Sequence, residues 1–397
     1  MSGAAKDSLL KPAIRQRPLM LHLGLASAAL AQPRLLRGQS VGNDFWQDEE
    51  GQSTKASMEK VVEGLRKYQM HPFERKMQRK SIVWSDGEAR LVWFAAKTAK
   101  KPKSPKAQIL VIPSMINGSE ILDIVPEEQS LLRWLAGEGY DVFLLEWGNM
   151  REDEELADIE TALSVKMPKL LDWFAKEKAD IPLYGLGYCM GGVLLAAMEI
   201  LHPDILDGLI FIATPWDFEA GGKESFAEAI RKWVGEGGLL RVAHLDYMPN
   251  EWLQLIFAGT DPAMVARKFS SFADMDRDSA KARLFVAVED WVNGGQDLPA
   301  GIIRQAVQDW YVKNKPAQGK WRVAGKTIKA EKIKKPSFVV VPAKDRIVPP
   351  ASARSLGKQI KGSAILTPDC GHISMMVSAK AKEEVWKPLN EWISAIK

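Results

Sequence analysis

The chain contains 397 residues, of which 46% are hydrophobic and 26% are charged, an ordinary balance for a globular protein of one large or two moderate domains. The two cysteines, Cys189 and Cys370, are too few for a disulfide framework, which favours a reducing compartment such as the cytoplasm. The formal net charge is only +4, and no apolar run reaches the roughly 18 to 20 residues that cross a bilayer.

Positive charge is concentrated toward the N-terminus. Residues 1–106 contain 20 Lys and Arg and 10 Asp and Glu, which gives +10, whereas the remaining 34 basic and 40 acidic residues give −6. Such a segment is often simply solvated, and it can also meet an anionic surface, a partner or a polyanion such as coenzyme A. We predict a basic, partly helical extension over residues 1–79, and no nucleic-acid partner.

Residues 11–31 resemble a secretion signal, because Lys11, Arg15 and Arg17 precede an apolar run that ends in small residues. His22 interrupts that run, and the charged leader is long. These two features favour an amphipathic helix that docks on the domain, on a partner or on an apolar surface.

From residue 80 onward, short apolar runs alternate with helical patterns. Two such runs flank Ser85-Asp86-Gly87, which predicts a leading antiparallel hairpin. Further strands are expected at 109–113, 142–147, 183–186, 209–213, 338–343 and 364–366, with helices at 131–137, 159–176, 193–201, 351–360 and from 379. This alternation predicts an α/β fold with a mostly parallel, doubly wound sheet.

The alternation stops between Asp217 and about Lys335. This stretch is rich in helical signals, tryptophans and single glycines, and it lacks short β runs. A mainly helical cap at 218–335, inserted late in the core, would lie at the carboxyl ends of the strands, where open α/β sheets bind ligands. The core is then expected in two parts, 80–217 and 336–397.

The segment Gly187-Tyr-Cys-Met-Gly-Gly192 connects a predicted strand to a predicted helix. A nucleophile at a sharp strand-to-helix turn between glycines is the elbow of the α/β-hydrolase fold, with sulfur here in place of the usual oxygen. The alternative is a buried structural cysteine in an ordinary turn, since cysteine is commonly buried.

Two later residues favour a catalytic Cys189. Asp345 follows the predicted strand 338–343, and His372 lies just beyond the strand 364–366. The order nucleophile, acid, base is that of the α/β-hydrolase fold. We therefore predict a triad in which His372 takes the thiol proton and Asp345 orients and stabilises the imidazole.

An oxyanion hole requires two backbone N–H donors. Met190, directly after the nucleophile, is the first candidate, and Met115 or Ile116 in the loop after 109–112 is the second. Cys370 lies two residues before the predicted base; a bystander thiol is the default, and a redox pair with Cys189 is the alternative. No metal or cofactor is predicted.

These motifs resemble those of the polyhydroxyalkanoate synthases over residues 80–397. Short sequence motifs in several parts of the chain carry the resemblance. They lie at residues 116–117, 121–123 and 126; at 131–134 and 142–147; at 187–192; at 214–218; at 291 and 310–311; at 345–349; and at 371–373. The family triad maps onto Cys189, Asp345 and His372. The resemblance implies a thiol acyltransferase that polymerises (R)-3-hydroxyacyl units from CoA thioesters through an acyl-cysteine intermediate.

The same triad would serve a hydrolase, so an intracellular polyester depolymerase or thioesterase is the alternative function. A third possibility is a scaffold protein whose former active site no longer catalyses a reaction. The resemblance further implies a hydroxyacyl-CoA substrate, a polyester product, and a cytoplasmic protein that can associate with polyester granules. Only about 80 residues precede the similar region, so a homodimer or a partner subunit is also expected.

Overall fold

The computed structural model describes residues 22–28, 30, 47–75, 81–97, 105–125, 129–177, 181–223, 225–238, 244–259, 261 and 263–396. The chain divides into two compact units, one of residues 1–75 and 261–293 and the other of residues 76–260 and 294–397. None of the helices in the described ranges combines the length and the apolar character needed to cross a membrane.

The first unit is built on the helices α2 (Glu49–Gln69), α10 (Ala263–Ala273) and α11 (Ala280–Asn293). A Cβ atom on Gly64 of α2 would lie 1.9 Å from the carbonyl oxygen of Phe269, so α2 and α10 approach closely there. Residues 261–293, which the sequence pattern places in the cap, therefore share a core with the N-terminal segment instead.

Of the predicted docking helix at 11–31, residues 22–28 are helical, with Ala26 buried in this core; residues 11–21, 29 and 31 lie outside the described residues.

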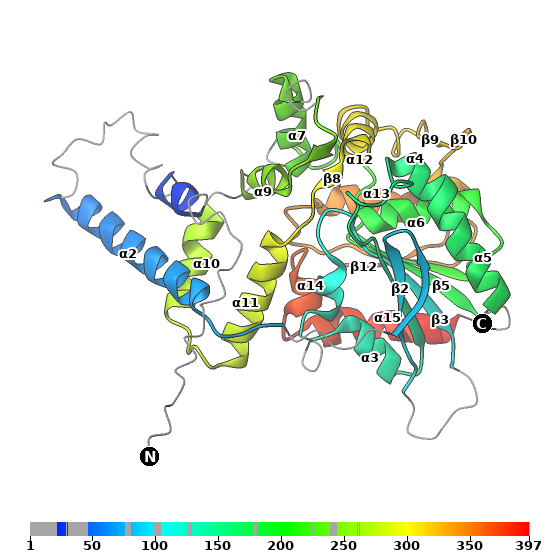
Figure 1. Cartoon of the computed structure of the whole chain (residues 1–397), viewed down its shortest axis with the longest axis horizontal. Coiled ribbons are helices and arrows are strands. Elements are labelled where there is room, and N and C mark those ends of the chain that lie inside the picture. Colours follow the sequence, from blue (N-terminus) through cyan, green and yellow to red (C-terminus); the bar gives the residue numbers. More distant parts are fainter. Residues whose placement is uncertain are drawn as a thin grey trace, which may run out of the picture. The chain divides into compact units, whose positions relative to one another are not determined.

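The second unit contains an eight-stranded sheet (Figure 1). Its strands, in spatial order, are β1 (Ser81–Asp86), β2 (Ala89–Phe94), β4 (Asp141–Glu146), β3 (Gln108–Ile112), β5 (Leu183–Tyr188), β6 (Gly208–Ile212), β11 (Ser337–Val340) and β12 (Ala364–Leu366). The pairs β1–β2 and β2–β4 are antiparallel and the others are parallel. The predicted mostly parallel sheet with a leading hairpin is confirmed.

Helices cover both faces of this sheet, and every residue of β3, β5 and β6 is accordingly buried. Figure 1 shows α5 (Met167–Glu177) and α6 (Met190–Leu201) over one face, and α3 (Leu131–Gly137) and α15 (Lys387–Ala395) over the other. The uninterrupted helix predicted at 159–176 consists of α4 (Ile159–Thr161), the π-helical η3 (Ala162–Lys166) and α5. Pro168 has no N–H for an ordinary helical bond, and the wider turn accommodates it.

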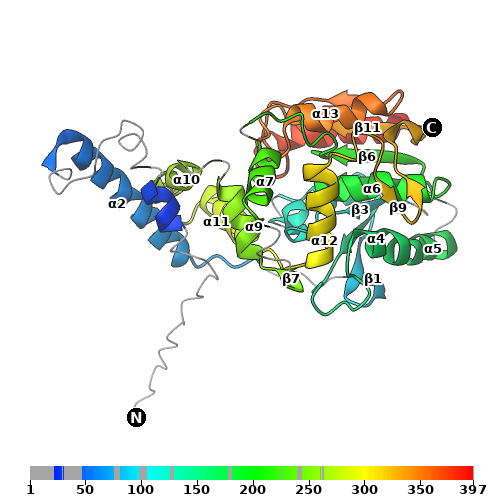
Figure 2. The same ribbon diagram turned by 90° about the horizontal axis from the view of Figure 1, so that it is seen from above.

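Between β6 and β11, the second unit contains α7 (Phe226–Gly235), α9 (Asn250–Gly259), α12 (Ala300–Gln305) and the π-helical η4 (Ala306–Val312). Helix α12 packs against α4 (Figure 2). Besides these helices, two short ladders occur in this stretch, which the sequence pattern did not indicate. Their two-residue strands, too short to show an alternating pattern, are β7 (Tyr247–Met248) with β8 (Leu298–Pro299) and β9 (Arg322–Val323) with β10 (Lys326–Thr327).

Helix α6 is buried at every position except Ile200, and it therefore encloses the carboxyl group of Glu199. Burial raises the pKa of Glu199 to about 8; Lys335 acts against this shift and Asp204 adds to it. Its Oε2 atom has no hydrogen-bond partner among the described residues. The carboxylate form of this side chain is thus costly in the folded state.

We expect Glu199→Gln to raise the free energy of unfolding by about 1–3 kcal/mol at pH 8 and to change it little near pH 4. Below the unfolded-state pKa of about 4.3, both states of the wild type are protonated. As the pH rises from there to about 8, only the unfolded chain releases the proton, so wild-type stability falls. Urea denaturation at pH 4, 6 and 8 measures the difference. The exposed Glu154→Gln is the control, and a gain that does not vary with pH would contradict the assignment.

Candidate active site

Cys189 lies in a strained turn between β5 and α6, with φ 54° and ψ −123°. Its N–H donates to the carbonyl oxygen of Ile212 at the end of β6 (2.9 Å). A Cβ atom on Gly187 would lie 2.4 Å from the Cα of Gly192, and one on Gly191 would lie 2.0 Å from the carbonyl oxygen of Ile112. The glycines around the cysteine are therefore required by close backbone approach, as in a nucleophile elbow.

Asp345 and His372 lie next to each other in the loops that follow β11 and β12. The Nδ1 atom of His372 is 2.7 Å from Oδ2 of Asp345, and the two residues are 8% and 5% exposed. The other carboxylate oxygen of Asp345 accepts the N–H groups of Ile347 (2.9 Å) and Val348 (2.8 Å). Both oxygens are thus engaged, and the carboxylate is held in one orientation toward the imidazole.

The third predicted residue, Cys189, lies near enough to His372 for its charge to act on the imidazole. Burial opposes protonation of the imidazole, but the charges of Asp345 and Cys189 and the hydrogen bonds of both side chains raise the pKa of His372 to about 10. The tilted ring of Tyr188 lies 5.2 Å from the imidazole ring and helps to enclose it. The structure thus brings together the three residues that the sequence pattern singles out.

The predicted oxyanion donors lie at the ends of two adjacent strands. Met190 is the first residue of α6, where helical bonding leaves N–H groups without acceptors. Met115 is 2% exposed and follows β3, which pairs with β5. The N–H of Ile116 donates to Oγ of Ser114 (3.1 Å) within its own loop, which makes Ile116 the weaker candidate of the two in that loop.

Both cysteines are unpaired thiols. Burial raises the pKa of Cys370 to about 11, and the carboxylates of Glu384, Asp345 and Asp369 contribute to this rise. Cys370 is therefore kept in the protonated, unreactive form near neutral pH. Its redox pairing with Cys189 remains only a prediction from sequence.

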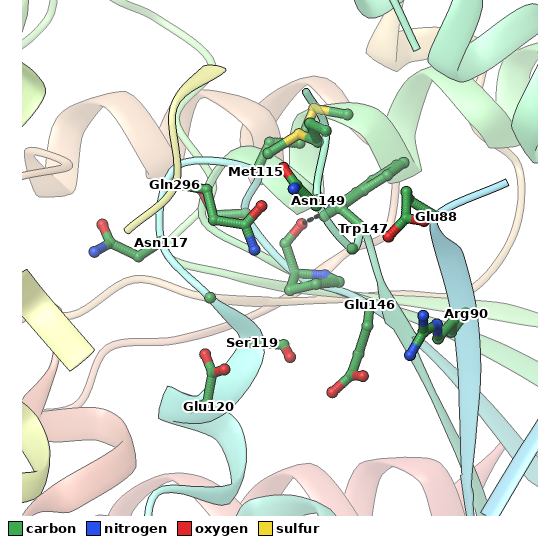
Figure 3. Close-up of a pocket in the computed structure, with 15 residues that line it drawn as sticks. Glu88, Arg90, Met115, Asn117, Ser119, Glu120, Glu146, Trp147, Asn149 and Gln296 are labelled. Carbon is green, nitrogen blue, oxygen red and sulfur yellow. Dashed lines mark hydrogen bonds between the residues drawn. The ribbon is translucent and has the colours of Figure 1, made fainter. Parts of the chain in front are cut away.

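A polar cavity of about 270 Å³ is lined in part by the predicted oxyanion loop, at Pro113, Ser114 and Met115. Figure 3 shows Glu88 and Arg90 on one side of it and Ser119 and Glu120 on the other, with Glu146 below. Cys189 and the other two triad residues do not line it. No sequence pattern indicates this cavity, because its walls come from segments that are distant along the chain.

A model of the alpha/beta hydrolase fold family matches residues 109–379, more than half of the chain. The chain belongs to the alpha/beta hydrolase fold family. Among solved structures of this fold, the monoglyceride lipase of Saccharomyces cerevisiae superposes on 81% of the chain and 97% of its own length. The TM-score is 0.51 at 12% sequence identity, a likeness of fold alone.

Curated relatives of this alpha/beta hydrolase share one name. The poly(3-hydroxyalkanoate) polymerase subunit PhaC of Thiocystis violacea is 26% identical over 319 residues, which cover 79% of this chain and 88% of that protein. Its counterpart in Allochromatium vinosum is 25% identical over 74% of this chain and 82% of its own length. The predicted resemblance to the polyhydroxyalkanoate synthases is confirmed.

Proposed function

We propose that the chain is a thiol acyltransferase that polymerises (R)-3-hydroxyacyl units from their CoA thioesters. The observation that carries this proposal is the grouping of Cys189 with the His372–Asp345 pair at the elbow, in a chain similar to poly(3-hydroxyalkanoate) polymerases. Cys189 is the nucleophile, His372 moves the proton, and Asp345 orients the imidazole.

In the first half-reaction, the ionised sulfur of Cys189 attacks the thioester carbonyl carbon. The bond from that carbon to the CoA sulfur breaks, and the departing CoA takes the proton of His372. The developing negative charge lies on the carbonyl oxygen, where the N–H groups of Met190 and Met115 would stabilise it.

In the second half-reaction, the hydroxyl oxygen of a monomer or of the growing chain attacks the acyl-cysteine. His372 accepts the hydroxyl proton, an ester bond forms, and Cys189 leaves as the ionised thiol. Both oxygens of Asp345 are already engaged, so the proton passes to the imidazole and not to the carboxylate.

The relatives are named as polymerase subunits, which supports a homodimer or a partner subunit for this chain as well. The product is an insoluble polyester, which supports a site of action at the granule surface in the cytoplasm. Sedimentation velocity before and after addition of substrate tests both points. A chain that stays monomeric and never sediments with its product would contradict them.

The deciding experiment supplies purified full-length protein with 3-hydroxybutyryl-CoA. We expect release of CoA thiol, an acyl group on Cys189 in the intact-protein mass spectrum, and sedimentable polyester that yields 3-hydroxybutyrate on methanolysis. Free 3-hydroxybutyrate without polymer would instead identify a hydrolase. Absence of CoA release would contradict the enzymatic function itself.

A further inference from the structure

Tyr311 belongs to the π-helical segment η4, which directly follows α12. At the end of this segment, the N–H of Lys313 donates to the carbonyl oxygen of Gln308, five residues earlier (3.1 Å). Such widened turns are frequent at functional sites, because they change which side chains face inward. Here Trp310 is buried and Tyr311 is partly buried next to it.

Contacts on two sides fix the position of Tyr311. Its ring meets that of Phe218 edge-on at 4.8 Å and that of Phe226 at 5.5 Å. The guanidinium group of Arg231 donates to the carbonyl oxygen of Tyr311 (3.1 Å) and to that of Phe218 (3.0 Å). The ring is therefore held in place before any substrate arrives.

Tyr311 lies at the same edge of the sheet as the triad. It lines a small cavity together with Pro215 and Ile347. Pro215 follows Ile212, whose carbonyl oxygen accepts the N–H of Cys189, and the N–H of Ile347 donates to Asp345. The segment that accepts the N–H of the nucleophile and the segment that carries the acid thus both adjoin this tyrosine.

The phenol hydroxyl of Tyr311 is available to donate a hydrogen bond. Burial raises its pKa, and the charge of the neighbouring Cys189 raises it further, so the hydroxyl stays protonated. Within the described ranges of the chain, this hydroxyl makes no hydrogen bond to another residue. A donor with no acceptor of its own, near enough to the nucleophile for the charge of Cys189 to act on it, is suited to bind the substrate.

The sheet order indicates which substrate atom it meets. Strand β5, which leads to Cys189, lies between β3 and β6, and β11 follows β6. Met115 lies after β3, so the carbonyl oxygen of the bound acyl group is expected on that side. Tyr311 lines its cavity with Pro215 and Ile347, which follow β6 and β11, so it lies on the side of Cys189 away from Met115, where the remainder of the acyl group is expected.

We propose that Tyr311 is a specificity-determining residue whose hydroxyl donates a hydrogen bond to the oxygen on C3 of the acyl group bound to Cys189. This inference rests on the proposed function. Such a hydrogen bond would let one residue distinguish a 3-hydroxyacyl thioester from a plain acyl thioester. When the acyl group lacks the oxygen on C3, the hydroxyl of Tyr311 is left buried without an acceptor, and binding of that acyl group is weaker.

The test compares Tyr311→Phe with the wild type on 3-hydroxybutyryl-CoA and on butyryl-CoA, which differ only in that hydroxyl group. The readout is the burst of CoA release that accompanies acylation of Cys189, expressed as kcat/KM. We expect the variant to lose roughly 10-fold on the hydroxylated substrate and to keep its value on butyryl-CoA. The wild-type preference between the two substrates should largely disappear.

The control is Tyr247→Phe, which removes a hydroxyl that donates to the carbonyl oxygen of Arg151 (3.0 Å). It should leave both kcat/KM values unchanged. An equal loss on both substrates in Tyr311→Phe would assign the tyrosine a merely structural role and overturn the inference, as would no loss on either. A wild type that releases no CoA from either substrate would instead contradict the proposed function, and this inference with it.

Discussion

Replacement of Cys189 by alanine is expected to reduce CoA release from 3-hydroxybutyryl-CoA by a factor on the order of 10⁶, to background. In the proposed mechanism the sulfur forms the covalent bond to the acyl group, and an alanine side chain cannot form that bond. Initial rates of thiol release measure the loss. The melting temperature of the variant should remain close to that of the wild type.

Two further variants separate the nucleophile from a general effect of thiol removal. Cys189→Ser should also lose most activity, because a hydroxyl is a much weaker nucleophile than a thiolate and needs a stronger base. Cys370→Ala removes the other thiol, which is buried, and should retain activity. An active Cys189→Ala protein would overturn the assignment of the nucleophile.

Asp345→Asn is expected to reduce the rate of acylation by about 10³- to 10⁴-fold. The Oδ1 atom accepts the N–H groups of Ile347 and Val348, so the amide oxygen of asparagine takes this place. Its NH₂ group then faces Nδ1 of His372, where Oδ2 now lies at 2.7 Å. A donor at that point forces the imidazole into the wrong tautomer.

Single-turnover CoA release measures this effect, and NMR of the imidazole nitrogens reports the tautomer. Asp369→Asn is a matched control, because this exposed carboxylate forms an ion pair with Lys344 (2.8 Å) and its substitution should leave the rate unchanged. If Asp345→Asn were nearly as active as the wild type, the orienting role of the carboxylate would be wrong.

The sequence predicted the sheet well wherever a local pattern determines the outcome. Buried strands such as β3 and β5 are short apolar runs, and the glycines around Cys189 follow from backbone crowding at one turn. Each of Cys189, Asp345 and His372 follows a predicted strand, and because parallel strands end at the same edge, the sequence placed the three residues at one edge of the sheet. Their catalytic roles stay a proposal.

The remaining features depend on contacts between distant segments. Packing of α10 against α2 requires Gly64 to meet Phe269, more than two hundred residues away. The sequence of neither helix indicates which helix it packs against. The polar cavity of Figure 3 and the place of Tyr311 beside Pro215 and Ile347 likewise arise only when several loops converge. For Tyr311, the one sequence signal was an aromatic pair in the predicted cap, which is more often a mark of packing.

The positive φ of Cys189 has a consequence for the stability of the chain. An L-amino acid at φ 54° costs roughly 1–2 kcal/mol that glycine would not incur. Thermal robustness alone would therefore favour glycine at this position. A side chain present at that energetic cost is an argument that the sulfur itself is needed there.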